Sequence, residues 1–166
     1  KTSFKILYPV EQNDILAIMR KYKLFFVSII VLGILFNLVW EYLHIPFFQF
    51  PLFLELLNLP RLILALIATL GDTVIILLIH LFLAKIYKVK IWEIGWNFNK
   101  TLAVLLCSTI SIVICEKLAL SFGLWSYVDN LPVVPIIQIN LSTFLQFIFI
   151  PLTTFYISSK IIYKFD

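Results

Sequence analysis

Long apolar segments alternate with short polar ones along this chain. Four of them, at about residues 24–44, 61–87, 101–122 and 141–162, are long enough to cross a bilayer as helices. Because backbone groups in hydrocarbon have no water to bond, such segments satisfy their hydrogen bonds internally as helices. The pattern predicts an all-α polytopic membrane protein, with residues 1–166 forming a single four-transmembrane-helix bundle.

Two shorter helices are predicted beside these spans. Asn13 or Asp14 can cap an N-terminal amphipathic helix that carries basic residues on one side and leads into the first span. Residues 51–58 follow a proline and precede another, which is typical of a short helix. At this length it cannot cross a bilayer, so we expect it at the interface.

Composition supports the membrane assignment and excludes other classes. The chain is 62% hydrophobic and 13% charged, whereas about half of an ordinary soluble domain is apolar. The net charge of +4 comes from basic residues dispersed at segment ends, which indicates membrane topology and no nucleic acid partner. Eleven of the thirteen Lys and Arg residues flank one set of segment ends, so both termini are expected to be cytoplasmic. Trp92 and Trp96, in the connection after the second span, are expected to be interfacial aromatics.

Polar residues interrupt the apolar spans in a pattern. Asn37, Glu41 and His44 fall on one face of the first span at 100° per residue. Asp72 lies in the second span, where it follows Gly71. Further polar residues are His80 in the second span, Glu116 in the third and Gln146 in the fourth. Because such groups are costly against lipid, we expect Asn37, Glu41, Asp72, Glu116 and Gln146 to face the bundle interior and line a funnel, with His44 at its mouth.

Several interpretations of these residues remain open. In a structural one, the carboxylates pair with Arg61, Lys117, tryptophan indoles or backbone and fix helix register. In a catalytic one, a carboxylic acid in a low-dielectric cavity holds a proton for a weakly basic substrate. Neighbouring aromatics would then stabilise a developing cation, with Trp40, Tyr42, Trp125 and Tyr127 as the candidates.

Two further interpretations concern metal ions and ion movement. Glu41 and His44 have the Glu-x-x-His spacing that di-iron bundles use. Those bundles need the motif twice, and no carboxylate stands three positions before His80. Proton or ion movement, for which isolated acids within spans suffice, is the third possibility.

The segment from Glu116 to Tyr127 resembles part of a known family. It has an acidic residue near a helix end followed by Gly-x-Trp-x-Tyr, and this is similar to the carboxy-terminal motif of the polytopic, heterodimer-type lycopene cyclase domain. That family's paired glutamates on the next helix are absent here, where residues 141–149 keep only the aromatics. Because the missing acids are the ones expected to do the proton chemistry in that family, cyclase activity is not carried over to this chain.

The whole chain is similar to a group of small bacterial four-span membrane proteins of unassigned activity. The shared features are an Asn-x-x-Trp-Glu segment, a Gly-Asp pair, an acidic-x-x-Ala-Leu-x-x-Gly-x-Trp-x-Tyr segment and a glutamine in the last span. In this sequence they fall at Asn37, Trp40 and Glu41, at Gly71 and Asp72, from Glu116 to Tyr127, and at Gln146. This resemblance implies a bacterial inner (plasma) membrane location.

The leading hypothesis is a small intramembrane enzyme that acts on an isoprenoid or lipid by carboxylate acid–base chemistry. The predicted catalytic residues are Glu41, Asp72 and Glu116, with Asp72 as the acid that carries the proton. The predicted substrate-binding residues are Asn37, Trp40, His44, Trp125, Tyr127 and Gln146. No metal ligands are assigned, and the sequence identifies no cofactor. The alternative is a non-catalytic accessory subunit of a larger membrane complex; the expected partners are the bilayer, a hydrophobic small molecule and other membrane subunits.

Overall fold

The computed structural model describes residues 12–49, 61–92 and 95–163. Its helices are α1 (Gln12–His44), α3 (Arg61–Tyr87), α4 (Phe98–Ser121) and α5 (Leu141–Tyr163), with a 3₁₀ turn η1 (Ile45–Phe47) after α1. Four segments within them are long and apolar enough to cross a membrane: Met19–Phe47, Leu62–Tyr87, Phe98–Ser121 and Leu141–Ile162. The protein is therefore an all-α, four-helix membrane bundle, as predicted.

Two differences from the predicted elements concern the ends of helices. The N-terminal amphipathic segment is not a separate helix, because α1 runs without interruption from Gln12 to His44. α4 begins at Phe98, before the predicted Thr101, because the side chain of Asn97 accepts a hydrogen bond from the backbone N–H of Lys100 and caps the helix. The short helix predicted at residues 51–58 lies outside the described residues.

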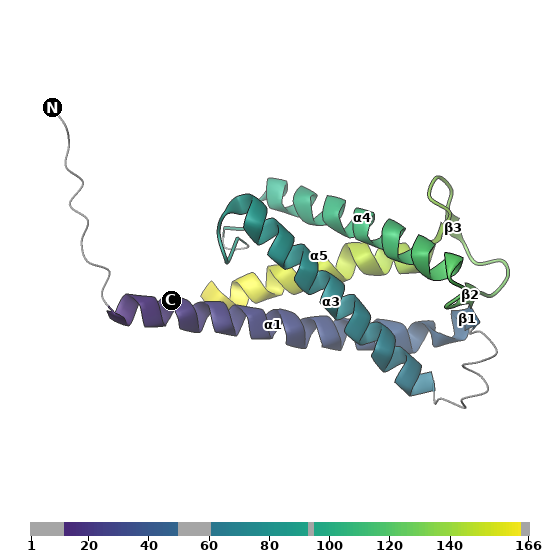
Figure 1. Cartoon of the computed structure of the whole chain (residues 1–166), viewed down its shortest axis with the longest axis horizontal. Helices are drawn as coiled ribbons and strands as arrows, with labels where there is room; N and C mark the ends of the chain where they lie inside the picture. Colours follow the sequence, from purple (N-terminus) through teal and green to yellow (C-terminus); the bar gives the residue numbers. More distant parts are fainter. Residues whose placement is uncertain (1–11, 50–60, 93–94, 164–166) are drawn as a thin grey trace.

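Helix packing follows the order α3, α1, α5, α4. α1 packs against both α3 and α5, and α5 packs against α4, whereas α3 and α4 make few contacts with each other. In Figure 1, α3 crosses the bundle obliquely and diverges from α4 towards the end that carries β1 and β2. The start of α1 and the end of α5 lie together at the opposite end.

Short strands form the end of the bundle where α3 and α4 diverge. β1 (Phe48–Gln49) pairs antiparallel with β2 (Ser126–Tyr127), placing Phe48 opposite Tyr127. β3 (Val133–Val134) pairs in the same sense with β4 (Ile139–Asn140). β2, β3 and β4 lie in the connection between α4 and α5, whereas β1 follows α1.

The main apolar core lies in the half of the bundle that contains the start of α1 and the end of α5. Its members include Phe25, Ile29, Ile79, Leu83, Val104 and Phe155. His80 is fully buried there, with its ring centroid 5.3 Å from that of Phe25, so it is an interior histidine away from the polar cluster described below. Trp92 is only 2% exposed, and its indole N–H donates to the carbonyl of His80. The Trp92 ring therefore packs into the core between His80 of α3 and Phe155 of α5, and its depth at the membrane interface stays a prediction.

Candidate functional site

The side-chain amide of Gln146 on α5 joins three helices. Its nitrogen lies 2.8 Å from Oε1 of Glu41 on α1 and 2.8 Å from Oδ2 of Asp72 on α3. The same nitrogen lies 3.2 Å from Oδ1 of Asn37, one turn before Glu41. Asn37 is itself fixed, because its amide nitrogen donates to the carbonyl of Gly33 at 2.9 Å. The acceptors around Gln146 are thus held in place by their own helices.

Glu41 and Asp72 form a carboxyl pair. Both side chains accept from the Gln146 amide nitrogen, at 2.8 Å each. Glu41 is 7% exposed and Asp72 is half-buried. The two carboxyl groups, which come from α1 and α3, therefore meet at one amide inside the bundle.

The end of α4 is built to turn the chain back on itself. Gly123 has a φ of +63°, a conformation that glycine adopts without steric cost. The backbone N–H of Leu124 donates to the carbonyl of Ala119 at 3.0 Å, and that of Gly123 donates to Leu120 at 3.1 Å. This pair of bonds is the Schellman pattern, which ends a helix and reverses the chain. As a result, Trp125 and the residues after it return towards the last turns of α4.

The returning segment holds Glu116. The indole N–H of Trp125 lies 3.4 Å from Glu116 Oε1, and the phenol of Tyr127 donates to the same oxygen. The Tyr127 oxygen also lies 3.0 Å from the hydroxyl of Thr143 on α5. Burial and the neighbouring Glu116 carboxylate raise the pKa of Tyr127 far above its ordinary value. Tyr127 therefore stays a neutral donor, and Glu116 receives the donors that suit an anion.

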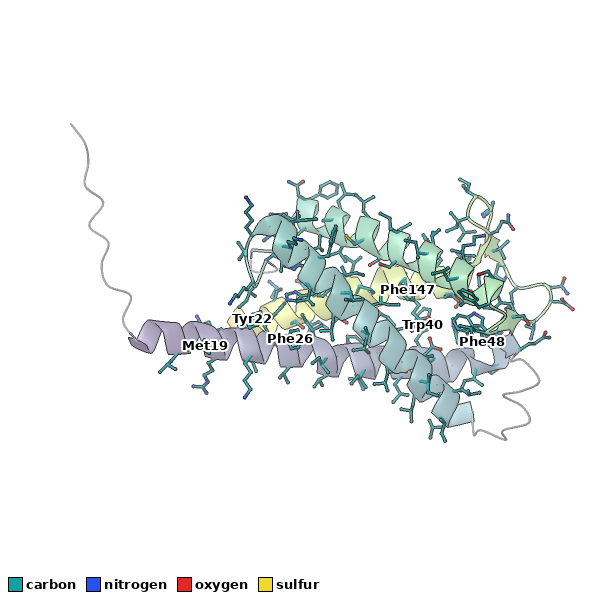
Figure 2. All side chains as sticks on the ribbon, viewed as in Figure 1. Met19, Tyr22, Phe26, Trp40, Phe48 and Phe147 are labelled. Carbon is teal, nitrogen blue, oxygen red and sulfur yellow. The ribbon has the colours of Figure 1, made fainter. Side chains whose placement is uncertain are left out.

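A cavity of about 300 Å³ lies between these groups, a volume at the lower end of the range for small-molecule sites. Its polar groups among the described residues come from Glu41, Asp72, Glu116, Thr143 and Gln146, with Trp125 at one wall. The remaining wall is almost entirely aliphatic and aromatic: Ile45, Phe48, Leu64, Ala65, Ile67, Ala68, Gly71, Ile75, Ile112, Cys115 and Phe147. In Figure 2, Phe48 and Phe147 lie in the half of the bundle opposite Met19 and Tyr22. The three carboxyl groups thus face one apolar cavity.

The predicted site residues divide into three sets by position. Glu41, Asp72, Glu116, Trp125 and Gln146 line the cavity. Asn37 and Tyr127 lie behind the lining and hold Gln146 and Glu116. The prediction that five polar residues face the bundle interior is confirmed for four of them, none of which exceeds 7% exposure: Asn37, Glu41, Glu116 and Gln146. The fifth, Asp72, is half-buried and accepts a hydrogen bond from Gln146.

The third set, Trp40 and His44, does not reach the cavity. The indole N–H of Trp40 donates to Nδ1 of His44 at 3.1 Å, and Nε2 of His44 is hydrogen-bonded to the hydroxyl of Ser142. Because Nδ1 accepts, Nε2 carries the proton of a neutral imidazole. His44 therefore ties the end of α1 to the start of α5, and the expectation that it stands at the mouth of a funnel is wrong. Tyr42 is 64% exposed and lies outside the cavity lining.

The same bonds answer the metal interpretation of Glu41 and His44. Both ring nitrogens of His44 are engaged by side chains, so neither is aimed at a site shared with Glu41. Among residues 12–49, 61–92 and 95–163, no group of three His, Cys, Asp or Glu side chains is placed to hold a metal ion. The arrangement favours proton chemistry at the carboxyl groups.

Sequence reasoning missed two residues that help to form the site. Thr143 contacts Tyr127 and lines the cavity; its position three residues before Gln146 places both on one helical face, a signal that could have found it. Phe48 also lines the cavity, and its ring lies 6.3 Å from that of Trp125. Its position depends on the pairing of β1 with β2, which no local pattern around Phe48 indicates.

The fold and the cavity together define a class: a four-span membrane protein with a carboxyl-lined cavity inside its bundle. Comparison with protein-family models, curated proteins and solved structures finds no significant match to this chain. The function is therefore inferred from the geometry of the cavity.

Proposed function

We propose that this protein is a small intramembrane enzyme that acts on a hydrophobic isoprenoid or lipid substrate by carboxylate acid–base chemistry. The observation that carries the proposal is that Glu41, Asp72 and Glu116, from three different helices, line one apolar cavity. Ionisable groups inside membrane spans are costly and usually mark a functional site. An apolar cavity with a few convergent polar groups is the usual form of a small-molecule site.

The carboxyl groups divide naturally into an acid and a base. Asp72, which shares the Gln146 amide with Glu41, carries a proton and donates it to a weakly basic carbon or oxygen of the substrate. Glu116, held by Trp125 and Tyr127, acts as the anion that stabilises the positive charge developing on the substrate. The faces of Trp125 and Phe48 add a cation–π contribution.

The resemblance to the polytopic lycopene cyclase domain supports the same substrate class. The paired glutamates of that family are missing from residues 141–149. In this chain Gln146 of that segment instead bonds an acid pair formed by Glu41 and Asp72 on the other helices. An equivalent acid function would thus come from α1 and α3.

The same geometry weighs against a purely accessory subunit. In such a subunit the carboxyl groups would be expected to be paired off away from any cavity. Glu116 accepts hydrogen bonds from the Trp125 indole and the Tyr127 phenol. An indole partner is what the structural interpretation expected. All three acids nevertheless line the cavity, which supports a catalytic or ligand-binding role.

For the location we propose a bacterial plasma membrane with both termini in the cytoplasm. The support is the charge distribution, with eleven of thirteen basic residues beside one set of helix ends. In this orientation the carboxyl-lined cavity occupies the outer half of the bilayer, because Glu41 and Glu116 lie near the ends of α1 and α4 that would be external.

The test is a comparison of Asp72→Asn with Asp129→Asn, the control being an exposed acid in a connecting segment. The amide keeps the shape of a protonated acid but cannot give up the proton. Lipids extracted from membranes that contain wild-type protein should include a converted species, identified by mass spectrometry. Asp72→Asn should lower its yield by about 10²-fold or more, while Asp129→Asn leaves it unchanged. Identical lipid profiles for wild type, Asp72→Asn and empty membranes would refute catalysis and favour the accessory subunit.

A further inference from the structure

The charge of the cavity wall restricts what the cavity can bind. Three carboxyl groups line it, and no Lys, Arg or His stands among the described lining residues. An anionic headgroup would leave water and lie beside three carboxyl groups, with no basic side chain among the described lining residues to pair with it. A buried charge without a partner is costly, and such arrangements exclude the wrong ligand. The cavity therefore suits an uncharged ligand and opposes fatty acids, lipid phosphates and diphosphates.

The shape of the cavity restricts the ligand further. Along α3 the lining runs from Leu64 to Ile75, a length of roughly 16 Å at the helical rise. The small side chains of Ala65 and Ala68, together with Gly71, leave the space along this face of α3. A volume of about 300 Å³ along that length suits one hydrocarbon chain better than two side by side.

The cavity reaches the outer surface of the bundle on the side of α3 that carries Gly71. Gly71 lines the cavity and is exposed, and a Cβ added to it would have no neighbour within 4 Å. Ile67, one turn earlier, also lines the cavity and is 58% exposed. α3 and α4 make few contacts and diverge at this end (Figure 1), so the exposed part of the lining lies where these two helices separate.

We propose that the cavity takes up one uncharged, single-chain lipid sideways from the bilayer, between α3 and α4 past Gly71, and rejects lipids of equal chain length that carry an anionic headgroup. This inference deepens the proposed function, on which it rests for the role of the carboxyl groups, by naming the charge and route of the substrate. The reactive part of the chain then lies between the Glu41–Asp72 pair and Glu116.

The experiment uses two photoreactive probes with the same chain, a palmitoyl-length alcohol and the corresponding fatty acid, each with a mid-chain diazirine. The full chain is reconstituted in phosphatidylcholine nanodiscs at neutral pH, where the fatty acid is ionised in water. The alcohol should label peptides covering residues 64–75 and 112–116, and the acid should label them at least tenfold less. Glu116→Gln should raise labelling by the acid towards that of the alcohol, because it removes one repelling charge.

Gly71→Leu tests the route of entry. The new side chain projects into open space, so it should obstruct the gap without disturbing packing and lower alcohol labelling at least tenfold. Leu70→Phe is the matched control: Leu70 is adjacent, 56% exposed and outside the cavity lining, and its substitution should leave labelling intact. If Gly71→Leu fails to fold, Ala68→Leu fills the same face of α3 and serves in its place.

Equal labelling by the acid and the alcohol would overturn the proposed selectivity, and undiminished labelling of the folded Gly71→Leu or Ala68→Leu variant would overturn the route. The proposed function fails independently of both. If the probes behave as expected while Asp72→Asn leaves the membrane lipids unchanged, the cavity is a binding site without catalysis. If Asp72→Asn abolishes conversion while the probes label other peptides, catalysis stands and the entry route is wrong.

Discussion

Replacing Gln146 by leucine should destabilise the bundle, because one amide nitrogen supplies the hydrogen bonds that join α5 to α1 and α3. Its three acceptors lie at 2.8, 2.8 and 3.2 Å, and the two amide hydrogens are shared among them. Hydrogen bonds between membrane helices contribute about 0.6 kcal/mol each on average, which gives about 1 kcal/mol for two. Loss of the donor also leaves buried Asn37 Oδ1 without this partner, at a cost of about 1 kcal/mol or more. We expect a total loss of roughly 2–4 kcal/mol in the free energy of unfolding.

The assay is reversible unfolding in mixed micelles by titration with a denaturing detergent, followed by tryptophan fluorescence. Phe149→Leu is the control: Phe149 lies three residues along α5 and is 56% exposed, so its substitution should change stability by no more than about 0.5 kcal/mol. A double-mutant cycle of Gln146→Leu with Asp72→Leu isolates the contact between those two residues, because leucine at position 72 removes the acceptor. If Gln146→Leu loses less than about 0.5 kcal/mol, or if the cycle gives no coupling, Gln146 does not connect the helices as described.

Two further predictions concern orientation and alkaline stability. With both termini cytoplasmic, a membrane-impermeant thiol reagent added outside cells should modify a cysteine introduced at Asn130 and spare one at Lys90; the reverse pattern would place the cavity in the inner half of the bilayer. Burial and the neighbouring Glu116 raise the pKa of Tyr127 above its ordinary value, so the stability gained from its neutral phenol is complete below about pH 9. That stability declines as the pH rises through about 10 and the unfolded chain ionises. Wild type should therefore lose more stability than Tyr127→Phe between about pH 9 and pH 11, and equal losses in the same unfolding assay would contradict the burial of this phenol.

The spans could be predicted because hydrophobicity over some twenty residues dominates the energetics of insertion. α3 was predicted with its observed bounds, and α5 to within one residue. The error at the start of α4 came from a single capping side chain, Asn97, which lies outside the apolar run and is recognisable only as a cap. The continuity of α1 was missed because a switch from amphipathic to apolar sequence looks like a boundary, although no helix-breaking residue separates the two parts.

The candidate site could be predicted one helix at a time but not across helices. The stripe of Asn37, Glu41 and His44 is correct as a helical face, yet its members have different partners: the first two bond Gln146, whereas His44 bonds Trp40 and Ser142. Helix periodicity fixes which residues share a face, but rotation and depth relative to other helices depend on packing. The pairing of Glu41 with Asp72 is of this second kind, since the residues come from separate spans.

Two glycines explain why the cavity forms where it does. Gly33 on α1 lies against Thr73 of α3 so closely that an added Cβ would stand 3.1 Å from Thr73 Cγ2, whereas a Cβ at Gly71 would meet nothing within 4 Å. α3 therefore packs closely against α1 at Thr73. Two residues earlier, at Gly71, a side chain on the other side of α3 would have no neighbour in contact. Because α4 is attached to the bundle mainly through α5, nothing in the described chain draws it onto α3 at this end. The Gln146 amide then holds the carboxyl pair at the edge of the resulting gap, so the packing that forms the cavity also keeps both carboxyl groups facing into it.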